Sequence, residues 1–341
     1  RTDYSFRPIL TGADDVAVAD IARMAEVGLR CFKIFTTYED MRLTDGEIYR
    51  IMDAIADIDG LAGFHAENHE LIADATDRTV AAAGPGIAAF PQSRPGLAEE
   101  AAIDLVSLYA RDHGVPIFIF HVSGGAALEA IRRARKLGTT VRGETCTHYL
   151  VFDDSVYRGT NRWMYVITPP IRGTRDRDDL WTALKTGGAL LRRIGPLRVR
   201  PAPQAPGSGR LHQHDGGRAR HRRPDADAVV AGGRRRSPLA RRLRPGHRTA
   251  SRRDLRALPP QGRHPRRLGR GHHHRRPRRL MAVAERAGFV GQRLPAYGDI
   301  PGRGRVMLTL IRGEVVARDG EFAGSRTGRF IPQDPSGWIP G

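Results

Sequence analysis

Residues 1–189 alternate short apolar runs with amphipathic helical patterns, and this alternation limits the fold more than any other feature of the chain. The apolar runs are Tyr4–Leu10, Cys31–Phe35, Leu61–Phe64, Pro116–Phe120 and Thr140–Gly143. Repeated strand–helix units build a parallel sheet that is covered by helices or closed into a barrel. We therefore expect an α/β fold in this part of the chain.

The segments between these runs carry helix signals. Thr44-Asp-Gly-Glu47 has the capping-box pattern, in which a threonine and a glutamate satisfy the first backbone donors of a helix. Helical spacing of apolar residues is seen in three sets: Ile48, Ile51, Met52 and Ile55; Ala102, Leu105, Val106 and Tyr109; and Leu128, Ile131 and Ala134. Three helices are expected at these positions.

The positive charge is confined to one segment. The whole chain has a formal net charge of +19, but residues 191–280 hold 27 Arg and no Lys against 4 Asp and no Glu. The remainder has 29 basic and 33 acidic residues, so the rest of the protein is mildly acidic. Residues 191–280 also lack Phe, Trp and Tyr and contain 11 Pro and 11 Gly. Such a segment buries too little apolar surface to offset its ordering entropy, and we expect it to be irregular.

The pattern divides the chain into three parts, 1–190, 191–280 and 281–341. In the last part, Val306–Ile311 and Glu314–Ala317 alternate around Arg312-Gly313, which predicts a β-hairpin.

Only two cysteines occur, Cys31 and Cys146, which favours a reducing cytoplasm and no disulfide framework. No apolar run approaches the roughly 20 residues of a membrane helix. The chain starts at Arg1 without a signal-peptide pattern, and we expect it to begin inside a longer protein.

Polar residues of metal-ligand type stand at the ends of three apolar runs. Lys33 and Tyr38 belong to the first, His65 follows the second and His121 follows the third. In a βα barrel the carboxyl ends of the strands line the active site. A buried ammonium is costly, so Lys33 would be deprotonated or converted by CO₂ to an anionic carbamate. Two neutral imidazoles and a carbamate would bind Zn²⁺ well.

Each of these residues also has a structural interpretation. A histidine after an apolar strand is often a satisfied core residue, a strand-end lysine can extend to solvent, and a tyrosine can simply pack. The repetition of one pattern at three strand ends favours a site.

Several longer stretches carry a family resemblance. DYSF, GLRCFKIFTTY, GFHAEN, SRP followed by Glu99 and Glu100, PIFIFHVS, GETCTHYL and TPPIR resemble, in order and spacing, the hydantoinase and dihydropyrimidinase family of cyclic amidohydrolases. Near the other end, GRGRVMLTLIRGEVVARDGEF resembles that family's closing β-sandwich strands. The resemblance implies a (β/α)₈ TIM-type barrel, of which about strands three to seven are present, with a remnant of a small C-terminal β-sandwich.

The resemblance also implies roles for individual residues. Lys33 matches a carbamylated lysine that bridges two zinc ions, and His65 and His121 match the histidines on the second metal. Tyr38 matches the tyrosine that stabilises the oxyanion. Thr168 stands where the family usually has a serine whose backbone contacts the cyclic amide.

The implied reaction is the opening of a hydantoin or dihydropyrimidine ring to an N-carbamoyl amino acid. The nucleophile would be a hydroxide held between two divalent metals. The implied partner is a small cyclic amide, with neither nucleic acid nor membrane. A homo-oligomer is also implied, since tetramers are common in the family.

Two family elements are missing from the printed sequence. No Asp-x-His-x-His strand is present before the first apolar runs, and the last-strand aspartate expected near residue 195 is replaced by Arg192–Arg198. If Arg192–Arg198 is read one base later, with CGN arginine codons, it permits Val-Gly-Ser-Asp-His-Cys. The same shift of Gly271–Arg278 permits Ala-Thr-Ile-Ile-Val-Asp-Pro. We therefore interpret about 192–280 as a frameshifted translation, and the chain as written as impaired in catalysis.

Three alternatives stay open. Allantoinase is a close one, because His148 in CTHYL is typical of that branch while hydantoinases more often carry Gln there. A non-catalytic scaffold is a second, although it would not need Lys33, Tyr38, His65 and His121 together. An arginine-rich nucleic-acid binder is the third, but natural arms usually mix Lys with Arg and often carry aromatic residues. The tract His272–His274 has no Cys, Asp or Glu nearby, and we regard it as incidental.

Overall fold

The structure is a computed structural model, and it describes residues 3–186, 190–193, 280–282, 297, 301–303, 307–319, 321–323 and 328–334. The basic segment from 194 to 279 lies outside the described residues, so the prediction of an irregular segment there stays a prediction. The side chains of 190–193, 280–282 and 301–303 are also outside the description.

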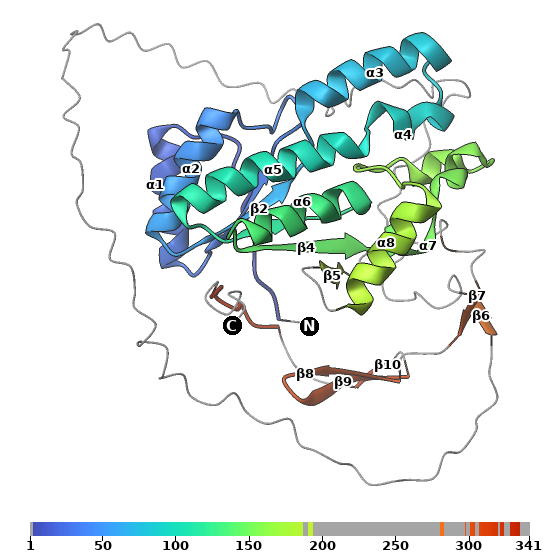
Figure 1. Ribbon diagram of the computed structural model, residues 1–341. Coiled ribbons are helices and arrows are strands. Elements are labelled where there is room, and N and C mark those ends of the chain that lie inside the picture. Colours follow the sequence, from blue (N-terminus) through green and yellow to red (C-terminus); the bar gives the residue numbers. More distant parts are fainter. Residues whose placement is uncertain are drawn as a thin grey trace, which may run out of the picture. The chain divides into compact units, whose positions relative to one another are not determined.

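A five-stranded parallel sheet forms the centre of the described residues (Figure 1). Its strands follow chain order: β1 (Cys31–Phe35), β2 (Leu61–His65), β3 (Ile117–Ile119), β4 (Val141–Cys146) and β5 (Leu190–Arg193). The register pairs Lys33 with Gly63 and Phe35 with His65. Neighbouring strands are parallel throughout, so their carboxyl ends lie at one edge of the sheet.

Helices connect successive strands, as parallel pairing requires. α1 (Asp15–Glu26) precedes the first strand. The connecting helices are α2 (Asp45–Asp57), α3 (His69–Ala83), α4 (Phe90–Ser93), α5 (Gly96–His113), α6 (Gly125–Lys136), α7 (Thr147–Val151) and α8 (Thr174–Lys185), with short 3₁₀ turns at Ile87–Ala89, Asp154–Arg158 and Arg162–Tyr165. The expected capping box is present, since Thr44 caps α2 and Glu47 bonds back to the Thr44 backbone. The other two expected helices are α5 and α6.

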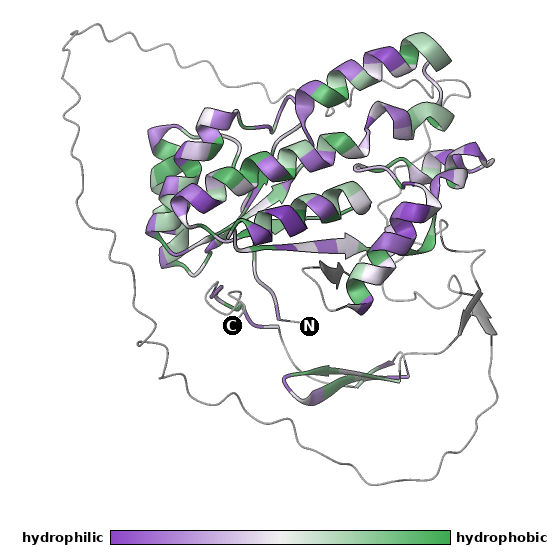
Figure 2. Ribbon diagram, in the orientation of Figure 1, coloured by the Kyte–Doolittle hydropathy of each residue, from purple (hydrophilic) through white to green (hydrophobic). Residues whose placement is uncertain are grey.

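The two faces of the sheet bury different residues. On one face Phe32, Ile34, Phe64, Ile117 and Ile119 join the large core formed with the helices. On the other face a second cluster consists of Cys31, Leu61, Phe118 and Phe120. Figure 2 shows that the covering helices carry both hydrophobic and hydrophilic residues, as expected for helices with one buried side. A sheet with apolar residues on both faces is typical of barrel strands.

The first apolar run departs from the prediction. Tyr4–Leu10 forms no continuous strand, only isolated parallel bridges from Tyr4 to Phe330 and from Ile9 to Lys33. The backbone of Lys33 donates to the carbonyl of Pro8 (2.7 Å) and accepts from the amide of Leu10 (2.9 Å). Proline has no N–H to offer a ladder, which limits regular pairing in this run.

The C-terminal part contains small antiparallel sheets. One consists of β8 (Leu308–Ile311), β9 (Glu314–Arg318) and β10 (Glu321–Phe322), and the other pairs β6 (Leu280–Ala282) with β7 (Pro301–Arg303). The predicted hairpin is therefore present as β8 and β9. Its turn residues Arg312 and Gly313 both have positive φ, of 51° and 81°, as a tight hairpin turn needs.

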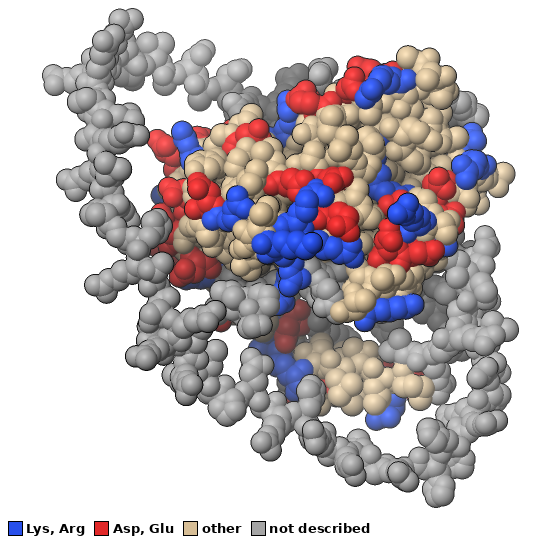
Figure 3. All heavy atoms as spheres, viewed as in Figure 1, with Lys and Arg blue, Asp and Glu red and all other residues tan. Residues whose placement is uncertain are grey.

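Charges on the described surface are mixed in sign. Figure 3 shows acidic and basic side chains next to one another over the helices that face the viewer. Of the helices that the structure describes, none combines the length and apolar composition needed to cross a membrane.

Candidate active site

Two histidines from neighbouring strands meet at the carboxyl edge of the sheet. His65 is the last residue of β2, and His121 follows β3. Nδ1 of His65 lies 3.0 Å from Nε2 of His121, and their ring centroids are 4.6 Å apart. Burial lowers the pKa of both imidazoles, so both are neutral near pH 7. The structure thus brings together two residues that are 56 positions apart in the sequence.

A buried carboxylate fixes the orientation of His65. Nε2 of His65 lies 2.7 Å from Oε2 of Glu67, which is fully buried. Burial alone would raise the pKa of Glu67, but the Arg94 guanidinium and the His65 hydrogen bond outweigh it and hold that pKa well below its usual range. The ionised Glu67 only accepts hydrogen bonds, so the proton of neutral His65 is on Nε2. Nδ1 of His65 then accepts from Nε2–H of His121.

Arg94 holds Glu67 in place through two hydrogen bonds. Its Nε and Nη2 donate to the two Glu67 oxygens at 3.0 and 2.7 Å. Its guanidinium also lies over the Tyr38 ring, with 5.7 Å from Cζ to the ring centroid. Such two-pronged pairs fix geometry as well as charge.

Tyr38 and Thr168 also meet beside the histidines. The Tyr38 hydroxyl is hydrogen-bonded to Oγ1 of Thr168, 130 residues away in sequence. The Tyr38 ring centroid lies 4.9 Å from that of His65. Tyr38 and His121 both have positive φ, of 77° and 43°, in the left-handed region that non-glycine residues rarely adopt. Backbone strain of this kind clusters at functional sites.

Lys33 lies close to the same group from β1. Its Nζ is 4.2 Å from the centroid of the Phe120 ring and 4.7 Å from that of Phe35. Its charge contributes to lowering the pKa of His65 and of His121. All five residues predicted for the site, Lys33, Tyr38, His65, His121 and Thr168, therefore lie in or beside one cluster.

The cluster fits part of a metal site. Two neutral imidazoles present nitrogens to each other, and a buried carboxylate holds the far nitrogen of His65, which is the usual support of a metal-bound histidine. Within the described residues, Nδ1 of His121 has no hydrogen-bond partner. No group of three or more His, Cys, Asp or Glu side chains suited to a metal occurs in the described part of the chain. His65, His121 and Lys33 would supply an incomplete ligand set.

Glu67 and Arg94 belong to the site without having been predicted from the sequence. The signal for Glu67 was available, because a carboxylate two residues after a buried strand-end histidine is a common orienting partner. Nothing in the sequence pairs Arg94 with Glu67, since the two are 27 residues apart and belong to different elements.

His148 is buried beside the same edge, at the start of α7 directly after β4. Burial lowers the pKa of His148 to about 4, and its charge would oppose protonation of His121. Within the described residues its Nδ1 has no hydrogen-bond partner.

Known proteins with similar sequences include D-phenylhydantoinases. A D-phenylhydantoinase of Escherichia coli O9:H4 (strain HS) is 31% identical over 186 residues, which is 54% of this chain and 40% of the relative. A solved D-hydantoinase structure matches with a TM-score of 0.52 and 30% identity, covering 54% of this chain and 41% of that one. A dihydropyrimidinase from Brevibacillus agri NCHU1002 matches with a TM-score of 0.53 and 27% identity, covering 57% of this chain and 42% of that one.

The matched region is similar in sequence and fold to hydantoinases and to a dihydropyrimidinase. No protein-family model matches the sequence. The chain spans about two fifths of the length of the curated relatives that it matches. The likeness confirms the expected fold class, an α/β partial barrel with separate antiparallel strands at the C-terminus.

Proposed function

We propose that the protein derives from an enzyme that hydrolyses a cyclic amide, opening a hydantoin or dihydropyrimidine ring to an N-carbamoyl amino acid. The observation that carries this proposal is the His65–His121 contact, in which two neutral, oriented imidazoles face one another at 3.0 Å. The relationship to hydantoinases supports the substrate class.

The proposed cofactor is a pair of divalent metal ions, with zinc as the expected metal. His65 and His121 would hold one ion through Nδ1 and Nε2, and Lys33 would bridge the pair as a carbamate formed with CO₂. Bound metals of this kind supply an activated water and polarise a carbonyl. Tyr38 would donate its hydroxyl proton to the oxygen that becomes negative as the ring carbonyl is attacked. The Thr168 backbone would hold the cyclic amide.

We propose that the chain as printed is impaired. The carboxylate that should pass a proton to the leaving nitrogen is replaced by the arginine-rich run near residue 195, which lies outside the described residues.

The test compares the printed chain with a frame-restored gene that also encodes the upstream strands. We expect the restored protein to bind divalent metal and to turn over hydantoin or dihydrouracil. Lys33→Met should reduce its metal content, because methionine cannot form a carbamate. Tyr38→Phe should keep the metal but lower kcat. Unchanged metal content in Lys33→Met would contradict the proposed role of Lys33.

Allantoinase activity is a second candidate, favoured by the buried neutral imidazole of His148. Assay of the restored protein with allantoin separates the two. If His148→Gln raises turnover of hydantoin relative to allantoin, His148 contributes to the choice of ring.

A further inference from the structure

Two buried ion pairs lie next to the histidines and are connected to each other by a hydrogen bond. Glu67 pairs with Arg94, as described above, and Glu99 pairs with Arg172 at 2.8 Å from Oε2 to Nη2. Both carboxylates are almost fully buried, and the two arginine side chains are 10% exposed. Burial raises the pKa of Glu99, and the Arg172 charge opposes that shift.

Arg172 connects the two pairs through three separate hydrogen bonds. Nη1 donates to the backbone carbonyl of Arg94 (3.0 Å), Nε donates to Oγ of Ser123 (2.6 Å), and Nη2 donates to Glu99. The amide of Ser123 donates to Oε1 of Glu99 (3.1 Å), and its hydroxyl donates to Oε2. One guanidinium therefore joins α5, the turn after β3 and the end of α4.

The connections close into a ring, because Ser123 is two residues after His121 in the chain. Starting from the imidazole contact, the ring passes through His65, Glu67, Arg94, Arg172, Ser123 and His121. The last link from Ser123 to His121 is covalent backbone. The ring fixes the two histidine-bearing strand ends relative to each other.

The buried charges of the ring cost more hydration free energy than a purely structural contact would require. Each buried charge loses several kcal/mol of hydration, and a buried pair of this kind is seldom more stable than apolar residues of the same volume. The apolar clusters already cover both faces of the sheet. Arg172 also follows Thr168 in one loop, so the same guanidinium anchors the segment that contacts Tyr38.

We propose that Arg172 and Glu99 are positioning residues that set the separation and tautomers of His65 and His121. Neither residue touches the imidazoles, and both act through Ser123 and the Arg94–Glu67 pair. The inference rests on the proposed function only where a metal is concerned, because the hydrogen-bonded ring is complete without one.

The first test uses the metal-free full chain and reads the ring nitrogens of the histidines by ¹⁵N NMR. His65→Gln and His121→Gln identify the two signals among the 13 histidines. We expect a protected Nε2–H on His65 in the unchanged protein. Arg172→Met should abolish that protection and shift the His121 signal, because it removes the hydrogen bonds from Arg172 to the Arg94 carbonyl and to Ser123.

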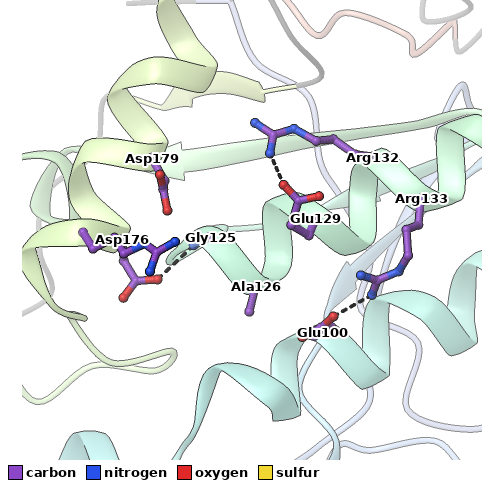
Figure 4. Close-up of a pocket in the computed structure, with 9 residues that line it drawn as sticks. Glu100, Gly125, Ala126, Glu129, Arg132, Arg133, Asp176 and Asp179 are labelled. Atoms are coloured by element: carbon purple, nitrogen blue, oxygen red, sulfur yellow. Dashed lines mark hydrogen bonds and ion pairs between the residues drawn. The ribbon is translucent and has the colours of Figure 1, made fainter.

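A matched control is Arg133→Met. Arg133 joins α6 to α5 through Glu100 (2.7 Å) and Asp104 (2.6 Å), but it lies at a surface pocket outside the ring (Figure 4). This change should leave both histidine signals as they are. Arg172→Lys keeps the positive charge but cannot make the three hydrogen bonds of the guanidinium. We expect it to be more stable than Arg172→Met and still to lack the protected His65 signal.

Ser123→Ala keeps the experiment decisive if Arg172→Met does not fold. It removes one hydroxyl, retains both charges and should shift the His121 signal more than that of His65. Unchanged His65 and His121 signals in any folded Arg172 variant would overturn the proposal, as would equal shifts in Arg133→Met.

The second test titrates Co²⁺ into the frame-restored protein, unchanged and with the same substitutions, and follows its visible spectrum. Loss of a supporting residue typically weakens metal binding by about 10–100-fold. We expect a weakening of that size in Arg172→Met and Glu99→Gln, and none in Arg133→Met. If the unchanged protein binds no Co²⁺, the proposed metal site fails, while the NMR result still decides whether Arg172 positions the histidines.

Discussion

At the residue scale, burial decides the state of the charged groups at the sheet edge. Glu67 stays ionised only because Arg94 and His65 surround it, and His65 stays neutral because it is buried. The same carboxylate on the surface would orient nothing, since exposed ion pairs contribute little. These residues therefore give specific predictions.

Glu67→Gln should destabilise the protein by about 3–5 kcal/mol, because Arg94 would remain buried without its counter-charge. Urea unfolding followed by circular dichroism measures the change. Glu129→Gln is the control, since Glu129 pairs with Arg132 on the surface and both side chains are at least half exposed. Equal effects of the two substitutions would show that burial of Glu67 is unimportant.

His148 should make stability fall at acid pH. Its folded pKa of about 4 is below the unfolded value of 6.5, so its contribution is complete above pH 6.5 and is lost as pH falls toward 4. Between pH about 7.5 and about 4.5 the loss should be about 2 kcal/mol. His148→Gln should reduce the acid loss by that amount, as measured by the free energy of unfolding at both pH values. A substituted protein with the same loss as the original would contradict the assignment.

At the element scale, local signals decide where helices begin. In α2, Thr44 accepts from the amide of Glu47, and Glu47 accepts from the amide of Thr44. Thr44→Ala should cost about 1 kcal/mol, seen as a lower Tm. Thr182→Ala removes the same hydroxyl from the interior of α8, where it donates to the carbonyl of Asp178 one turn earlier. That control should change stability by less than about 0.5 kcal/mol.

Strand packing sets a different limit at Gly63. A Cβ there would lie 2.6 Å from the Phe120 ring and 3.2 Å from the carbonyl of Phe32. Gly63→Ala should therefore cost about 1–3 kcal/mol through overpacking and displace Phe120 from Lys33. Gly46→Ala is the matched control, because nothing lies within 4 Å of its Cβ position in α2. Thermal unfolding should show Gly46→Ala as neutral or stabilising, and a similar loss in both would rule out the steric explanation.

At the scale of the whole molecule, the described sheet resembles only part of a hydantoinase barrel. The basic segment follows β5 at the place where the resemblance expects the aspartate strand, and it lies outside the described residues. The frameshift interpretation explains why its composition departs so sharply from that of the remainder.

Sequencing the gene through codons 185–300 tests that interpretation. We expect a frame in which the aspartate motif is readable across Arg192–Arg198. The protein made from the restored frame should lose most of the excess positive charge, which isoelectric focusing would show. If no frame of the DNA encodes the aspartate motif, the interpretation is wrong.

The sequence by itself determined the periodic features of this protein. Apolar runs and capping residues indicated β1 to β4, α2, α5, α6 and the hairpin at Arg312-Gly313, because these depend on local chemistry. The positions of His65 at the end of β2 and of His121 just after β3 followed from the same periodicity, whereas Lys33 lies in the middle of β1 and not at its end. Tyr4–Leu10 was predicted wrongly as a continuous strand, since its composition does not show which backbone partners it will find.

Only the tertiary structure decided which distant side chains come into contact. The pairing of Glu67 with Arg94, the reach of Arg172 to Ser123 and the contact of Tyr38 with Thr168 join residues from 27 to 130 positions apart. Charged residues show no periodicity that reveals such partners. Their pairing is set by the order in which parallel strands bring their carboxyl ends to one edge of the sheet. A charge buried there destabilises the fold unless a counter-charge lies beside it.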